Sequence, residues 1–483
     1  MAVLPPNNAL AWAHFRLRGG WVRSLTWTGG AMALLAMVII SSVRLNPNES
    51  TRILFNWASG LLALQGLCLV LFVPGRISNT IRADLTSKMI ESHRLMPLPP
   101  AHAIAGYIGG GAGGPLVFAA GSFLLGGATA IAGKADWQNW LFAHVVLLMF
   151  AGFVWVLVSY IAFGAKLGAG ILFLPLMIPY LSEGGVLSLF PGLMVLLSPV
   201  IGRSIFDLHN AGMTLPATYA IAFAAQIAVA TICFIAASRK YRSSDSIGTD
   251  TVLGLCFVLV WVAASFAGMR AWEDFRPLGW SPMRLPLEAQ VVGSMIVGML
   301  VAMSPMAANA QERVRYRRHE ALRDPAPIRK PWNLAMVLLI ATAAIVLIPF
   351  APPLVAEFKI TPDRIARSAA IISLFLIGLY FLFDWCYTTI GRAAWAMFIW
   401  LLLTWGAPIA IDLVRYGLAE SGEIEPMATV ATCSPVGAMI VLWTDAEMGR
   451  VVNTTPGILA QCAIALVPLT LRLLRRTRRA TGQ

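Results

Sequence analysis

The sequence predicts an all-α polytopic membrane protein, and three observations lead to this fold class. The chain is 58% hydrophobic over 483 residues, only 12% of it is charged, and its mean hydropathy is +0.73. Soluble proteins are about 45–50% apolar and about 25% charged. At about 20 apolar residues per span, a chain of this length can hold about a dozen transmembrane helices. These values exclude a water-soluble enzyme and a disordered chain, and six cysteines are too few for a disulfide scaffold.

The apolar runs predict about 12 transmembrane helices in order along the chain. These spans cover residues 27–43, 53–73, 101–130, 139–164, 167–202, 214–237, 249–269, 288–308, 333–352, 368–389, 393–413 and 456–474. The fifth stretch is too long for one helix and contains four prolines and two adjacent glycines, so we expect a helix followed by a broken segment there. The short apolar stretch 427–443 is interpreted in the same way.

Basic residues predict the orientation of the chain. Most of the 36 lysines and arginines fall in alternate loops and at the two ends, which places the N- and C-termini in the cytoplasm. The formal net charge of +13 is therefore a topology signal, and we do not expect nucleic acid as a partner.

The order of the elements indicates two parallel six-span repeats. The shift that lays the charged loop 75–100 on loop 311–332 also lays Ser198-Pro199 on Ser434-Pro435. The predicted division is an interfacial segment, a first six-span half, a second six-span half and a basic tail: residues 1–26, 27–240, 241–475 and 476–483.

Residues for catalysis or for metal and cofactor binding do not form a recognisable pattern. The six histidines fall in six different segments without a His/Cys cluster. The glycine-rich run 109–114 lies inside a predicted span, where glycines let neighbouring helices approach closely. We therefore expect no catalytic residue, no metal and no cofactor in this chain.

The loop between the second and third predicted spans is the most informative about function. Apolar residues recur every fourth position and form one stripe: Ile77, Ile81, Leu85 and Met89. Asp84 and Lys88 are spaced for an i,i+4 ion pair on another face. Prolines between residues 97 and 100 then prevent the helix from continuing. The pattern predicts a short amphipathic helix held rigidly at the cytoplasmic mouth, where a partner could dock and pass force into the spans.

This loop resembles the corresponding cytoplasmic stretch of ABC-2 type transporter permeases. In that family the stretch contains an acidic residue, a Glu, a few apolar residues, a Thr-Pro-Leu-Ser turn and a Gly-Lys that opens the third span. Glu91 and Pro97-Leu98 match by residue and spacing. The sequence departs from the pattern at three positions: Met96, Pro99 and Tyr107. Residues 12–23 are similar to the interfacial elbow helix that precedes the first span in the family.

The resemblance implies a transmembrane permease subunit, most often an exporter, that is driven by separate ATPase subunits in a bacterial inner membrane. Such a subunit is not itself an enzyme, and its partners are the ATPases and membrane lipids. The expected ATPase-coupling residues lie in both loops: Arg82, Asp84, Lys88, Glu91, Arg94 and Pro97 in the first, and Arg315, Arg317, Arg318 and Glu320 in the second. The second loop has Asp324-Pro325-Ala326-Pro327 in place of the Pro-Leu-Ser turn.

Three alternatives stay open from the sequence. An intramembrane enzyme acting on lipid would need a polar cluster at membrane depth, and the sequence does not show one. An ion-coupled secondary transporter would need Asp384 or Asp412 to face a cavity near the membrane midplane. A scaffold built on a permease-like fold cannot be separated from a working permease by sequence.

Overall fold

The computed structural model describes residues 8–95, 97–135, 137–164, 216–243 and 252–257, together with isolated positions between 248 and 470. This part of the chain is about 93% helical and contains no strand. Five of its helices are long and apolar enough to cross a membrane, and each overlaps one of the predicted spans. The prediction of a helical protein with membrane-spanning helices is thus confirmed. Most of the second half, the fifth span and the repeat lie outside the described residues.

The chain enters the first long helix through a sharp turn. Helix α1 (Ala9–Leu17) is capped by Asn8, whose side-chain oxygen accepts a hydrogen bond from the Ala11 amide at 3.0 Å. Gly19 and Gly20 then have φ of 98° and 59°, a left-handed conformation that glycine adopts without steric cost. Helix α2 (Gly20–Leu45) starts directly from this turn. The segment that the sequence predicts as one interfacial helix is therefore a helix, a turn and the first residues of α2.

The second long helix extends well past the end of the predicted span. A single turn of 3₁₀-helix, η1 (Pro47–Glu49), leads into α3 (Ser50–Leu67), the π-helical turn η2 (Cys68–Phe72) and α4 (Val73–Thr86). At 1.5 Å per residue, these 40 residues form a rod of about 60 Å. A π-turn leaves a helix carbonyl without its usual partner. The Trp155 indole donates a hydrogen bond of 2.7 Å to the Leu69 carbonyl, which satisfies a backbone acceptor inside this turn.

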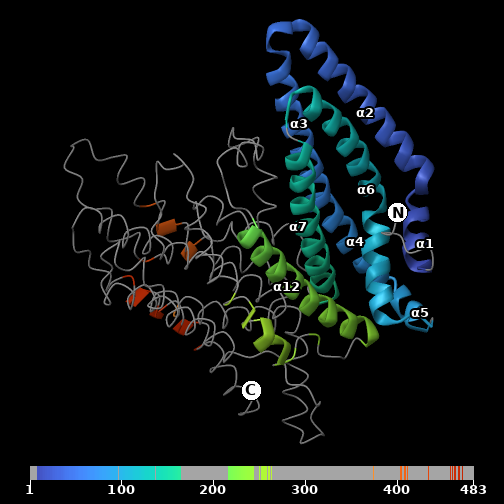
Figure 1. Ribbon diagram of the computed structural model, residues 1–483. Coiled ribbons are helices and arrows are strands. Elements are labelled where there is room, and N and C mark those ends of the chain that lie inside the picture. The colour runs from blue at the N-terminus through green and yellow to red at the C-terminus, as the bar shows by residue number, and fades with distance from the viewer. Residues whose placement is uncertain are drawn as a thin grey trace, which may run out of the picture. The chain divides into compact units, whose positions relative to one another are not determined.

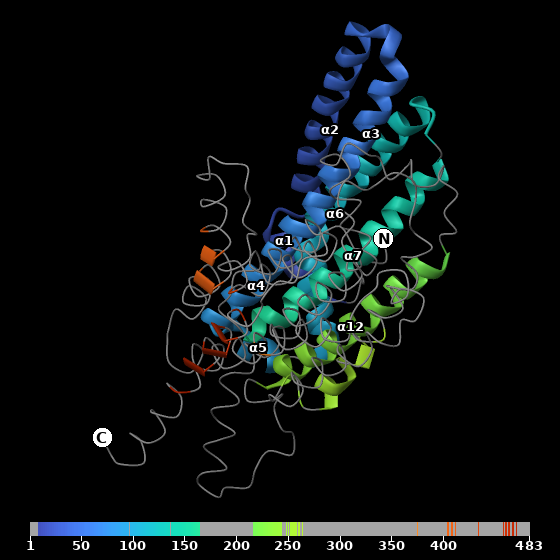
Figure 2. The same ribbon diagram turned by 90° about the vertical axis from the view of Figure 1, so that its left-hand side faces the viewer.

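The remaining helices of this unit are α5 (Met89–Leu95), α6 (Pro100–Ala132), α7 (Trp137–Gly164) and α12 (Pro216–Arg242). Two of them, α6 and α7, pack against that rod, and α12 packs against α6 and α7. Helix α6 contacts α1, α2, α3 and α4, and α7 lies beside α12 (Figures 1 and 2).

Glycines of α6 allow α1 and α4 to approach this helix closely. A Cβ added at Gly110 would lie 2.7 Å from the His14 Cβ, and one at Gly111 would lie 2.7 Å from Ile77 Cγ1. Real Cβ atoms do not approach other atoms so closely, so these positions require glycine. The expectation that the glycine run serves helix packing is met in the structure.

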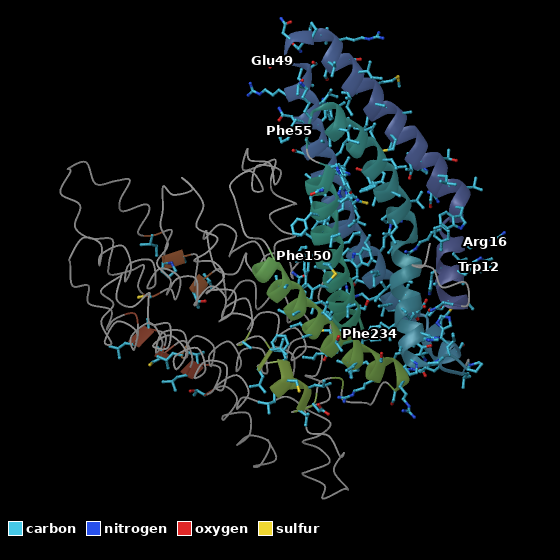
Figure 3. All side chains as sticks on the ribbon, viewed as in Figure 1. Trp12, Arg16, Glu49, Phe55, Phe150 and Phe234 are labelled. Atoms are coloured by element: carbon cyan, nitrogen blue, oxygen red, sulfur yellow. The ribbon has the colours of Figure 1, made fainter. Side chains whose placement is uncertain are left out.

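Several chain segments meet at one end of this unit. Helix α1, the end of α4, α5, the start of α6 and the end of α12 lie together there (Figure 1). The turn around Glu49 lies at the other end of the rod (Figure 3). The predicted first cytoplasmic loop therefore lies at one end of the helical unit.

Candidate functional site

Helix α5 is short, and one of its sides packs against the unit whereas the other is exposed. It is separated from α4 at Lys88, whose φ of 59° cannot continue an α-helix. Ile90 and His93 are buried, whereas Met89 and Leu95 are 51% and 88% exposed. The single amphipathic helix predicted for this loop is therefore two helices, and only the second projects from the unit.

Arg94 anchors α5 to the end of α12. Its Nε donates a hydrogen bond of 2.6 Å to the Tyr241 carbonyl, and its Nη2 donates one of 3.1 Å to the Lys240 carbonyl. The last carbonyls of a helix lack intrahelical donors and carry partial negative charge, so a guanidinium binds them well. The Arg94 Nη1 also lies 2.6 Å from Glu91 Oε1. The Arg94 side chain is 13% exposed and the Glu91 side chain is 61% exposed, so the pair joins an inner anchor to an outer carboxylate.

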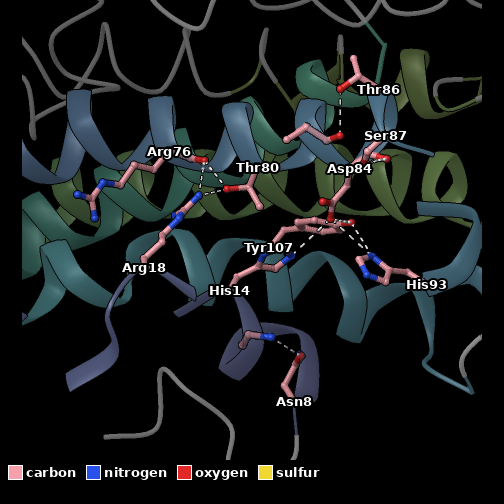
Figure 4. A network of polar contacts seen from close by, with 12 residues as sticks. Asn8, His14, Arg18, Arg76, Thr80, Asp84, Thr86, Ser87, His93 and Tyr107 are labelled. Carbon is pink, nitrogen blue, oxygen red and sulfur yellow. Dashed lines mark hydrogen bonds and ion pairs between the residues drawn. The ribbon is translucent and has the colours of Figure 1, made fainter. Parts of the chain in front are cut away.

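A buried carboxylate lies behind α5 and joins four helices. We call His14, Asp84, His93 and Tyr107 the Asp84 cluster (Figure 4). The Tyr107 hydroxyl donates a hydrogen bond of 2.8 Å to Asp84 Oδ2. His14 Nε2 lies 3.5 Å and His93 Nδ1 lies 3.6 Å from the same oxygen. Since these residues come from α1, α4, α5 and α6, the cluster fixes α5 against the helices around it.

His93 lies in an environment that disfavours its charged form. Burial lowers the pKa of His93 below its ordinary value, and the proximity of His14 acts in the same direction. The Asp84 carboxylate opposes this shift without cancelling it. His93 Nδ1 also lies 3.2 Å from the Tyr107 hydroxyl oxygen. The arrangement positions helices, and within the described part of the chain no group of His, Cys, Asp or Glu is placed to hold a metal ion.

The predicted coupling residues of the first loop separate into two groups. Lys88, Glu91 and Pro97 are exposed, and Arg82 is half-buried on α4. Asp84 and Arg94 are instead turned inward and hold the loop in place. The expected Asp84–Lys88 ion pair does not form, because Lys88 leaves the helix and Asp84 faces Tyr107.

The predicted residues of the second loop are not among those that the structure describes. They are Arg315, Arg317, Arg318 and Glu320. The candidates for an ion pathway, Asp384 and Asp412, also lie outside the described residues.

Sequence reasoning missed the partners of Asp84. His14 and His93 are 79 positions apart in different predicted segments, and nothing in their local pattern joins them. A signal was present at Tyr107, which stands where the family pattern has a lysine at the start of the third span. A hydroxyl at that position supplies the donor that the buried carboxylate needs.

No family model, no curated protein and no solved structure matches this chain.

Proposed function

We propose that this chain is the transmembrane permease subunit of an ATP-driven transporter of the ABC-2 type, and that α5 is the element that binds the ATPase. A bacterial inner membrane and outward transport follow from the resemblance of the loop to that family. The observation that supports the proposal best is the construction of α5: an exposed edge of Met89, Glu91 and Leu95 on a helix anchored firmly from behind.

The anchors supply a physical route from the exposed edge to the spans. A push on α5 reaches α12 through the hydrogen bonds of Arg94 and reaches α6 through His93 and Tyr107. Two exposed apolar side chains beside a carboxylate form a surface that a protein partner can bind by burial and by one charge-assisted contact. The chain itself would supply the path, and ATP hydrolysis would take place on the partner subunits.

Affinity purification of the full chain in mild detergent tests this proposal. An ATPase subunit should co-purify with the wild-type chain, and Glu91→Arg should lose it because the substitution reverses the exposed charge. Glu49→Arg is the matched control, since Glu49 is also exposed between two long helices but lies at the other end of the rod. Glu91 is preferable to Arg94 for this test, because loss of Arg94 would also release α5 from α12.

The proposal fails if the wild-type chain purifies from its native membrane without any nucleotide-binding subunit. It also fails if Glu91→Arg and Glu49→Arg retain the ATPase equally well.

A further inference from the structure

A separate group of basic side chains surrounds the turn between α1 and α2. We call Arg18, Arg23 and Arg76 the elbow arginines. The segments 8–24 and 73–86, from which they come, contain five arginines, and Asp84 is their only acidic residue. Asp84 faces Tyr107 and two histidines, so its charge does not neutralise the elbow arginines. The elbow arginines therefore concentrate positive charge without a carboxylate of their own segments to neutralise it.

Arg18 is held in place at the edge of α4. Its Nη2 donates hydrogen bonds to the Arg76 carbonyl, at 3.3 Å, and to the Thr80 hydroxyl (Figure 4). Its Nη1 is shielded from solvent and has no acceptor within the described part of the chain. Burial lowers the pKa of Arg18, and the nearby positive charge of Arg76 lowers it further. Two guanidinium groups that repel each other form a place where an anion is stabilised by both positive charges.

Hydrogen-bond donors of Arg76 on α4 and Ser24 on α2 converge at one position of α6. A Cβ at Gly114 would lie 3.2 Å from Arg76 Nη1 and 3.4 Å from the Ser24 hydroxyl oxygen. The guanidinium of α4 and the hydroxyl of α2 thus meet at a position where α6 has no side chain. A phosphate group has several acceptor oxygens and can accept from more than one such donor at once.

The surroundings of the turn are those of a membrane surface. Trp12 and Trp21 are exposed, Arg16 lies 5.1 Å above the Trp12 ring, and Phe15 packs edge-on against Trp21. Exposed tryptophans are typical of the headgroup level of a bilayer. The apolar surface of α2 starts at the same turn, and only 11% of the most apolar stretch of this helix is buried in the protein. A ligand with an anionic head and an apolar tail fits this combination better than a free anion does.

We infer that Arg18 and Arg76, with Ser24, form a binding site for the phosphodiester headgroup of an anionic phospholipid whose acyl chains lie along α2. Binding there would fix the turn between α1 and α2 at the membrane surface. The site does not depend on the proposed transport function, because its residues are distinct from α5 and from the Asp84 cluster.

The test uses the full chain, delipidated in detergent, and measures its thermal unfolding while lipid is added. The probes are short-chain phosphatidylglycerol, short-chain phosphatidylcholine and inorganic phosphate. Phosphatidylglycerol should raise the midpoint in a saturable way, because a ligand that binds the native state stabilises it. Phosphatidylcholine and inorganic phosphate should raise it much less.

Substitutions of single arginines test which side chains contribute to lipid binding. Arg18→Gln and Arg76→Gln should each weaken phosphatidylglycerol binding about fivefold, and the double variant about 25-fold, as expected for the loss of basic residues near a membrane surface. Arg44→Gln and Arg52→Gln are matched controls, because both arginines are exposed, Arg44 near the end of α2 that is far from the turn and Arg52 near the start of α3. Arg76→Gln keeps the test usable if Arg18→Gln fails to fold, since the Arg76 side chain is exposed and its carbonyl contacts survive.

Three results would overturn the inference. They are equal binding of phosphatidylglycerol and phosphatidylcholine, unchanged binding in the double variant, and protection by inorganic phosphate as strong as that by phosphatidylglycerol.

Discussion

The helices are connected in different ways at the two ends of the unit. At the end that contains α5, side chains bridge helices that are far apart in sequence: Asn8 reaches the His102 carbonyl, Tyr107 reaches Asp84, and Arg94 reaches Tyr241. At the other end, the linkers at residues 46–50 and 133–135 contain local hydrogen bonds. Examples are those from the Glu49 amide to the Asn46 carbonyl and from the Ala135 amide to the Ala130 carbonyl.

The difference indicates which end can transmit force. A linker held by local hydrogen bonds can change its conformation without moving distant helices. A linker tied by side chains to α1, α6 and α12 cannot, so a displacement of α5 is passed on to them. This contrast is the physical basis for placing the partner at α5, and the following substitutions test it.

The largest effect is expected at Asp84. Asp84→Ala removes the buried carboxylate that accepts from Tyr107 and lies beside His14 and His93, which should lower the free energy of unfolding by about 3 kcal/mol. Glu49→Ala, at the opposite end, should produce no measurable change. Denaturant unfolding in detergent, followed by tryptophan fluorescence, measures both. Equal stability of the two variants would contradict the contrast between the ends.

A second prediction concerns the contact between α1 and α6. Gly110→Ala places a methyl group 2.7 Å from the His14 Cβ and 3.1 Å from the Ala11 carbonyl oxygen, so the free energy of unfolding should fall by about 1–3 kcal/mol. Gly60→Ala has open space around the new Cβ and should be neutral or stabilising by about 0.5–1 kcal/mol, because alanine favours a helix. Opposite signs in thermal unfolding would support the packing shown by the structure, whereas stabilisation by Gly110→Ala would refute it.

The third prediction is a pH dependence that originates at the α5 end. His93 has a lowered pKa in the folded state because it is buried, so the unfolded chain binds a proton more readily. The free energy of unfolding should therefore be fully retained above the ordinary histidine pKa of about 6.5 and fall as the pH drops below it. The variant His93→Gln should show a flatter profile over this range. Stability that rises on acidification, with the same slope in both proteins, would contradict this assignment.

The smallest effect is expected at two matched linker residues. Lys88 and Lys134 both have φ of 59°, one at each end of the unit. Replacement of either by glycine should relieve the left-handed strain and stabilise the protein by about 1 kcal/mol or less. Circular dichroism melting curves measure the gain. Destabilisation of Lys88→Gly alone would show that the Lys88 side chain has a structural role that its exposure does not suggest.

Sequence alone could predict the long helices but not the bonds between them. The helices α2, α6, α7 and α12 follow from uninterrupted apolar runs, since apolar length is a one-dimensional property. The sequence does not predict that the second helix continues through Pro74 to Thr86, because the π-turn that precedes the proline has no local signal and its Leu69 carbonyl is bonded by Trp155, far along the chain.

The candidate site could be predicted only in outline, because its local pattern is visible in the sequence and its tertiary partners are not. The pattern of residues 77–100 indicates an exposed charged element, and Glu91 is exposed. Helical spacing suggested Lys88 as the partner of Asp84, yet the actual partners come from three other helices. Side-chain partners across a tertiary fold are not encoded in the local period of a helix.

Photocrosslinking at two exposed leucines in native membranes tests the proposed role of α5 most directly. Leu95 on α5 and Leu45 at the end of α2 are 88% and 79% exposed, and they lie at opposite ends of the unit. A photoreactive amino acid at position 95 should capture an ATPase subunit, with a yield that changes when ATP is added, and the same probe at position 45 should not. Capture of an ATPase from position 45, or no capture from position 95, would contradict the proposal that α5 binds the ATPase.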